Sequence, residues 1–143
     1  MRRLALGLGF GAFAWVGLRL ARRYVRYEIA GASMQPALRP GDWVIVDRRA
    51  YEGRPPRAGE VALARDPRED RRALVKRVVR LQPDGRLWLL GDNAGASTDS
   101  RTLGAFPAEA LLGRVRWRYW PPPLGAVRGM SERAPGPPGW GDR

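Results

Sequence analysis

The chain has 143 residues, a length typical of one domain, and a formal net charge of +12. It contains no cysteine and no histidine, which excludes disulfides, thiol nucleophiles, Ser-His-Asp or Cys-His catalytic groups and the usual zinc sites. Any catalysis must therefore rest on hydroxyls, carboxylates, backbone groups or lysine. The positive charge indicates attraction to a membrane surface or a nucleic acid, or simply a solvated basic surface.

An uninterrupted apolar run covers residues 4–18 and follows Met-Arg-Arg. As a helix this run would be roughly 22 Å long, short of the ~30 Å hydrocarbon core of a bilayer. It can extend to Ala21 if Arg19 snorkels. Residues 1–23 are therefore predicted to form an apolar helix that anchors the chain in the cell membrane through residues 4–21, with a buried or interfacial helix as the alternative. Basic residues are denser after the run than before it, which favours a cytoplasmic active site.

From residue 24 the apolar residues recur with a period of two, which is typical of β-strands. The predicted strands cover residues 24–30, 42–48, 60–65, 73–81, 85–90 and 113–120, and residues 107–113 could form one or two helical turns. Residues 121–143 are rich in proline and glycine and are predicted to be disordered. The predicted fold class is therefore mostly β, with one domain at residues 24–120 between the apolar helix and the tail.

Lys76 is the only lysine among 26 basic residues, and it lies in the apolar segment Ala-Leu-Val-Lys-Arg-Val-Val. Unlike a guanidinium, an ammonium can lose its proton when it is desolvated. On a strand, Lys76 shares a face with Leu74 and Val78. If that face is buried, Lys76 could act as a base. If Val75 and Val79 point inward instead, Lys76 is an ordinary surface lysine, and the periodicity leaves both possibilities open.

Two further segments are rich in polar residues. Ser33 follows the first predicted strand, in Gly-Ala-Ser-Met-Gln-Pro, and could present its hydroxyl to a cleft or serve as a turn or capping serine. Residues 91–104 are predicted to form an ordered loop packed on the sheet, in which Asp99 and Arg101 could pair. A metal site in this loop would lack enough carboxylate ligands.

Three segments, SMQPALRPGD, VKRVV and GDNAGASTDSR, resemble in order the serine, lysine and C-terminal boxes of type I signal peptidases and their relatives. The resemblance runs from about Tyr27 to Tyr119. Only residues 80–89 separate Val79 from Leu-Gly-Asp-Asn, so the extra domain of the larger signal peptidases is missing. This compact layout is most similar to the nickel-type superoxide dismutase maturation proteases. The resemblance implies a signal-peptidase-like antiparallel β domain.

The resemblance also implies a role for each candidate site residue. Ser33 is expected to be the nucleophile and Lys76 the general base of a Ser/Lys dyad, with the Ser33 backbone N–H stabilising the oxyanion. Ser97 is expected to orient the lysine, and Asp99 and Arg101 to form an ion pair that stabilises the loop. The precursor-protein substrate is expected to bind as an extended strand beside the segments that precede Ser33 and Lys76. This chemistry requires no cofactor and no metal, and no nucleic-acid partner is expected.

The chain departs from the family pattern at two positions. Gly31 stands where some relatives carry a second hydroxyl for the oxyanion hole, and Ala37 replaces the usual threonine after the box proline. Both departures concern the surroundings of the nucleophile and leave the dyad itself in place.

The expected function is removal of an N-terminal propeptide, with the nickel superoxide dismutase precursor as the substrate. A small signal peptidase acting on exported proteins would use the same chemistry. A non-catalytic basic module bound to membrane or nucleic acid would explain the charge and the alternating arginines of residues 113–120, but not the three motifs. A self-cleaving repressor of the SOS type would require a DNA-binding module and an internal cleavage loop, and neither is recognisable in the sequence.

Overall fold

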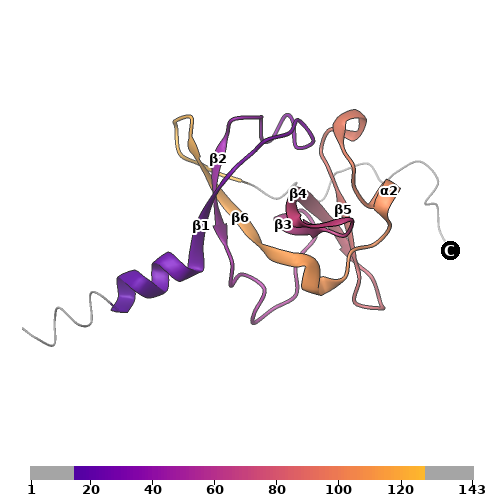
Figure 1. Ribbon diagram of the computed structural model, residues 1–143, viewed down its shortest axis with the longest axis horizontal. Helices are drawn as coiled ribbons and strands as arrows, with labels where there is room; N and C mark the ends of the chain where they lie inside the picture. The colour runs from indigo at the N-terminus through magenta and orange to yellow at the C-terminus, as the bar shows by residue number, and fades with distance from the viewer. Residues whose placement is uncertain (1–14, 128–143) are drawn as a thin grey trace, which may run out of the picture.

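The computed structural model describes residues 15–127 of the chain. Residues 15–23 are helical and lead directly into the first strand, and this helix projects away from the sheet (Figure 1). Most of the predicted membrane anchor, residues 4–21, lies outside the described residues, as does the predicted tail from residue 128 onward. In the described part of the chain, no helix is both long and apolar enough to cross a membrane.

The described residues fold into one antiparallel sheet of seven strands. The strands are β1 (Tyr24–Glu28), β2 (Trp43–Asp47), β3 (Val61–Asp66), β4 (Glu69–Leu81), β5 (Leu87–Leu90), β6 (Leu111–Trp120) and β7 (Gly125–Ala126). Their order is β1-β2-β6-β3-β4-β5, and β7 pairs with β6. In Figure 1, β6 runs between the β1–β2 pair and the β3–β5 group. The mostly β fold class is confirmed.

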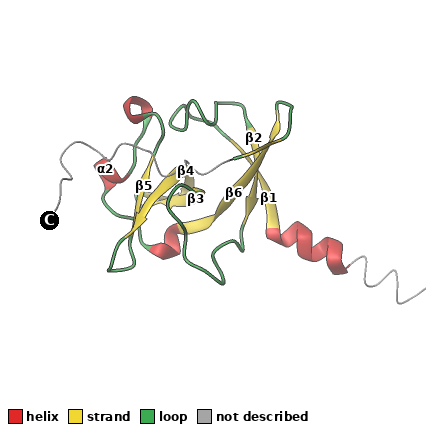
Figure 2. Cartoon of the chain, turned by 180° about the vertical axis from the view of Figure 1, so that it is seen from behind, coloured by secondary structure: helices red, strands yellow, loops and turns green. Residues whose placement is uncertain are grey.

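Short helical turns interrupt the loops that connect these strands (Figure 2). They are η1 (Ala94–Ala96), α2 (Ser100–Leu103) and η2 (Ala108–Ala110). The predicted helical turns at residues 107–113 shorten to η2, because β6 already begins at Leu111. Strand β4 begins at Glu69 rather than at residue 73, because β3 and β4 are joined by a tight turn at Pro67 and Arg68. Within the predicted tail, Ala126 pairs with Trp117 of β6, so residues 125–126 add a short strand to the sheet.

The central part of the sheet is buried on both faces. Alternate residues of β3 and β4 belong to two separate core clusters, with Val61, Leu63 and Val75 in one and Ala62, Ala64, Leu74 and Val78 in the other. Because successive side chains of a strand point to opposite faces, each face of these two strands packs against its own core. Lys76 therefore lies on a buried face, and its exposed fraction is 3%.

The alternating arginines of β6 lie beside carboxylates of neighbouring segments. The pairs are Arg114–Glu60 at 3.0 Å, Arg116–Asp47 at 3.3 Å and Arg118–Asp42 at 4.0 Å. Asp47 also accepts two hydrogen bonds from Arg23, at 3.0 and 2.9 Å, which connect the end of the helix at residues 15–23 to the sheet. These arginines are therefore engaged within the molecule.

Candidate active site

Ser33 and Lys76 meet although they are far apart in the sequence. Ser33 lies in the turn region that follows β1, and Lys76 lies in the middle of β4. The Lys76 Nζ donates a hydrogen bond to the Ser33 Oγ over 2.8 Å. This distance is within the range expected between a nucleophile and its general base.

Lys76 is buried and, within the described part of the chain, has no carboxylate partner in an ion pair. None of the ion pairs between described residues involves Lys76. Burial lowers the pKa of the Lys76 amine; the negative charge of Asp99 opposes this, and the positive charges of Arg72 and Arg101 reinforce it, leaving the pKa below the ordinary lysine value. The neutral amine, which can accept a proton, is therefore easier to form than in an exposed lysine.

The next residue along β4, Arg77, is also buried, but it is paired with a carboxylate. Its guanidinium donates to both carboxylate oxygens of Asp92, at 2.8 and 2.6 Å, and to the Gly59 carbonyl at 2.7 Å. The sequence motifs alone indicated no role for this pair. A signal was present, since a buried arginine requires a carboxylate partner and Asp92 follows shortly after a predicted strand.

Asp99 organises the loop after β5. Its carboxylate is fully buried and accepts hydrogen bonds from the Gly91 N–H at 2.9 Å, the Ser97 Oγ at 2.6 Å and the Arg101 Nε at 2.9 Å. Burial alone would raise the pKa of Asp99, but these hydrogen bonds hold that pKa well below its usual range. The carboxylate is therefore ionised, and the expected ion pair with Arg101 is present.

Ser97 contacts Asp99 rather than Lys76. Its hydroxyl donates to the Asp99 Oδ2, and no hydrogen bond between Ser97 and Lys76 is found among the described residues. The orienting role of Ser97 stays a prediction. In this arrangement Ser97 would act on Lys76 indirectly: its hydroxyl binds Asp99, and the negative charge of Asp99 acts on the lysine.

The start of the same loop packs directly against the backbone of Ser33, and the sequence motifs alone did not indicate this contact. A Cβ added to Gly91 would lie 2.2 Å from the Ser97 Oγ and 2.6 Å from the Ser33 carbonyl oxygen. The Asn93 N–H donates to that same carbonyl over 2.9 Å. The loop thus holds the backbone of Ser33 in place. The available signal was a glycine placed between a buried strand and Asp92.

A groove of about 490 Å³ leads to the Ser33–Lys76 pair. Residues between Tyr27 and Met34 line one side of the groove and residues between Glu69 and Lys76 line the other, with Ala96 and Thr98 nearby. Strand β4 pairs with β3 along residues 69–77, whereas its pairing with β5 begins only at Arg77. In the described part of the chain, the other edge of β4 before Arg77 has no paired strand, so its backbone groups can pair with an extended peptide.

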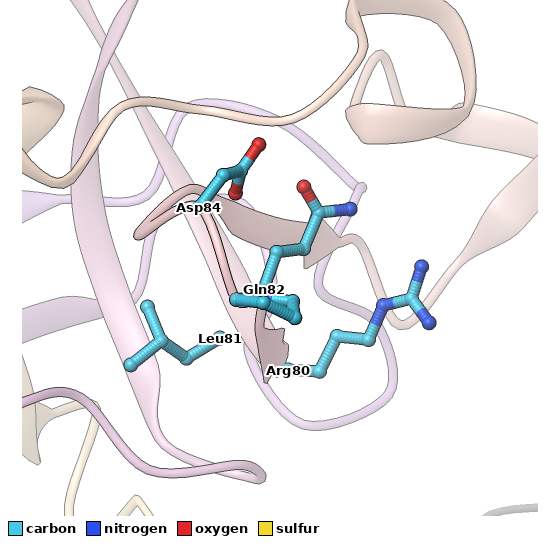
Figure 3. Close-up of a pocket in the computed structure, with 5 residues that line it drawn as sticks. Arg80, Leu81, Gln82 and Asp84 are labelled. Carbon is cyan, nitrogen blue, oxygen red and sulfur yellow. The ribbon is translucent and has the colours of Figure 1, made fainter.

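A second hollow lies at the turn between β4 and β5. It is lined by residues 80–84, and Figure 3 shows the side chains of Arg80, Gln82 and Asp84 extending from this hairpin. It contains neither Ser33 nor Lys76. The groove beside β4 is therefore the candidate active site.

Comparison with known proteins agrees with this assignment. The family model described as signal peptidase, peptidase S26, matches residues 5–84 and 80–120. The chain belongs to the S26 signal peptidase family. Membership in S26 supports a serine-type peptidase activity and confirms the family-level resemblance. The narrower resemblance to nickel superoxide dismutase maturation proteases stays a prediction.

Several curated relatives show how far the similarity extends. The chain is 30% identical over 129 residues to the mitochondrial ATP-independent inner membrane protease subunit 1a of Arabidopsis thaliana, covering 73% of this chain and 77% of that protein. It is 28% identical over 160 residues to probable signal peptidase I-2 of Synechocystis sp., covering 82% and 73%. It is 28% identical over 111 residues to mitochondrial inner membrane protease subunit 1 of Homo sapiens, covering 64% and 67%.

Proposed function

We propose that this S26 protein is an endopeptidase with a Ser33–Lys76 dyad. The observation that carries the proposal is the 2.8 Å hydrogen bond between a buried lysine amine and a serine hydroxyl at the groove. Neutral Lys76 removes the Ser33 proton as the Oγ attacks the scissile carbonyl. The resulting ammonium protonates the leaving amine, and Lys76 then activates the water that hydrolyses the acyl-enzyme ester.

The groove suits an extended polypeptide substrate. A peptide laid along the open edge of β4 would exchange backbone hydrogen bonds with it, as an added strand does. The Ser33 N–H is the expected oxyanion donor. Gly31 lines the groove but has no hydroxyl to contribute, so the second donor that some relatives carry is either absent here or replaced by a backbone N–H.

The proposed substrate is the nickel superoxide dismutase precursor, whose N-terminal propeptide would be removed. Support comes from the compact layout, since β5 begins at Leu87 soon after β4 ends at Leu81 and no extra domain lies between them. Cleavage of signal peptides is the second candidate, supported by the similarity to a probable signal peptidase. In either case we propose membrane association through residues 4–21. Maturation of the dismutase precursor fits an active site that leans toward the cytoplasm, whereas cleavage of signal peptides would need the active site on the outer side of the membrane.

The basic-module interpretation is disfavoured by the ion pairs of β6. The arginines that alternate along residues 113–120 would have to present their charges to a polyanion. Instead, Arg114, Arg116 and Arg118 each lie beside a carboxylate of this chain. The stripe therefore stabilises the sheet and leaves little free charge for a nucleic acid.

A mass-spectrometric cleavage assay tests the proposed function. The purified protein is incubated with a nickel superoxide dismutase precursor and a signal-peptide-bearing preprotein together, with Ser33→Ala and Lys76→Ala as parallel samples. Trimming of the dismutase precursor alone, lost in both variants, is the expected result. Trimming of the preprotein would instead assign a small signal peptidase. Failure to cut either protein, or cutting that survives both substitutions, would contradict the dyad.

The pH dependence of cleavage should report the lowered pKa of Lys76. Because the neutral amine is the base, kcat/KM is expected to rise with pH and to reach its plateau below the ordinary lysine pKa of about 10.4. The contribution of Lys76 to folding stability should also increase with pH. At Lys76 the unfolded chain binds more protons than the folded one between the lowered pKa and about 10.4, so the contribution of this residue to the free energy of unfolding should increase with pH there.

The comparison for this pH experiment is Lys76→Met, measured by chemical denaturation over the same pH range. The variant lacks the titrating amine and should not show this stability increase. A wild-type rate that rises only above pH of about 10 would show that Lys76 keeps an ordinary pKa.

A further inference from the structure

A side-chain hydrogen bond crosses the groove some distance from the dyad. The Tyr27 hydroxyl of β1 donates to the backbone carbonyl of Ala73 in β4 over 3.2 Å. Both residues line the groove, and both pack against the core cluster that contains Val75. Tyr27 is therefore held in place by its ring while its hydroxyl reaches the opposite wall.

The acceptor of this bond belongs to the part of β4 that, among residues 15–127, pairs with β3 alone. Ala73 pairs with Arg65 of β3, and β5 does not begin to pair with β4 until Arg77. The unpaired edge of a strand presents backbone N–H and C=O groups that a further strand can use. In the free protein, the Tyr27 hydroxyl occupies one of these acceptors.

We propose that Tyr27 is a specificity-determining residue whose hydroxyl competes with the substrate backbone for the Ala73 carbonyl. The inference rests on the proposed peptidase function. A substrate amide that binds this carbonyl must displace the tyrosine, so one hydrogen bond is exchanged for another with little net gain. A substrate residue without an amide hydrogen, such as proline, leaves the hydrogen bond from Tyr27 to Ala73 in place, and the substrate loses little binding affinity.

The position of the contact indicates which substrate residue is affected. Ala73 precedes Lys76 by three residues along β4, which corresponds to roughly 10 Å at ~3.3 Å per strand residue. The affected substrate amide is therefore expected about three residues from the scissile bond. Burial raises the pKa of Tyr27 above its ordinary value, although the positive charge of Arg72 opposes this, so the hydroxyl remains a donor across the working pH range.

Tyr27→Phe provides the matched variant, because it removes the hydroxyl and keeps the ring. The substrate is a synthetic peptide spanning the bond that the wild type cuts, in the dismutase precursor or in the preprotein. A parallel peptide series carries one N-methyl group in turn on each backbone amide within four residues of that bond. Full-length wild type, Tyr27→Phe and Tyr24→Phe are compared by kcat and KM on every peptide. Tyr24 is in the same strand but outside the groove lining, so its variant controls for loss of a hydroxyl.

With the unmodified peptide, Tyr27→Phe is expected to lower KM about three- to tenfold, since its Ala73 carbonyl is free for the substrate. N-methylation at one position should erase this gain while changing wild-type KM by less than about twofold. Tyr24→Phe should match the wild type throughout. The inference is overturned if Tyr27→Phe and wild type have the same KM on the unmodified peptide, or if no methylated position removes the difference. In that case, cleavage by the wild type that depends on Ser33 and Lys76 would still support the proposed function. Failure of the proposed function itself would appear as cleavage that persists after substitution of Ser33 or Lys76.

Discussion

Ser33→Ala is expected to lower kcat/KM for precursor cleavage by at least about 10³-fold, because it removes the only hydroxyl bonded to Lys76 among the described residues. Lys76→Arg should cause a loss of similar size. It keeps a positive charge but cannot supply a neutral base, since a guanidinium stays protonated. Steady-state kinetics with a peptide spanning the cleavage site measures both losses.

Stability measurements separate a catalytic defect from misfolding in these variants. Lys76→Met should keep or raise Tm, because it replaces a buried amine that makes no ion pair with an apolar side chain of similar length. Thr102→Ala removes an exposed hydroxyl outside the groove lining and should retain full activity. An active Lys76→Arg enzyme would show that Lys76 is not the general base.

Gly91→Ala is expected to damage the site without touching a reacting group. The new Cβ would lie within 2.6 Å of both the Ser33 carbonyl oxygen and the Ser97 side chain, so either the nucleophile turn or the loop must move. A displacement of about 1 Å can cost on the order of 10² in rate, and overpacking of this kind lowers the free energy of unfolding by about 1–3 kcal/mol. Peptide kinetics and urea denaturation measure the two effects.

Gly95→Ala is the matched control for this substitution. Gly95 belongs to the same loop, but the nearest atom to its added Cβ is the Asn93 Oδ1 at 3.9 Å, an ordinary contact. Its activity should stay within about twofold of the wild type and its stability within about 0.5 kcal/mol. If Gly91→Ala behaves like Gly95→Ala, the loop does not position Ser33, and the close contact is relieved without consequence.

The strands were predictable wherever one face is apolar and the other polar. In β1, Val25 and Tyr27 alternate with exposed Arg26 and Glu28, and the period of two is plain in the sequence. The start of β4 was missed because its charged residues, next to a proline, are equally typical of a loop. Strand β7 was missed because Gly125 and Ala126 pair through backbone groups, for which side-chain pattern carries no signal.

The same reasoning explains why the sequence left the orientation of Lys76 open. Leu74 and Val75 are adjacent in β4, yet both are buried because they pack into different core clusters. When both faces of a strand are covered, alternation no longer distinguishes inside from outside. Only the packing of β4 between the two clusters shows that the amine is desolvated.

The sequence by itself determined the chemical inventory: without histidine or cysteine, a side-chain base had to be a carboxylate or Lys76. The resemblance of three motifs to a known family then associated Lys76 with Ser33 and with the loop at residues 91–104. The tertiary structure decided how these groups act on one another. The contact of Lys76 with Ser33, the hydrogen bond from Ser97 to Asp99 and the tyrosine bridging the groove all depend on loops and strand edges brought together by folding. The ordinary pKa and the hydrogen-bonding groups of a side chain follow from its residue type. The distances between side chains and their removal from water arise only when the chain is packed.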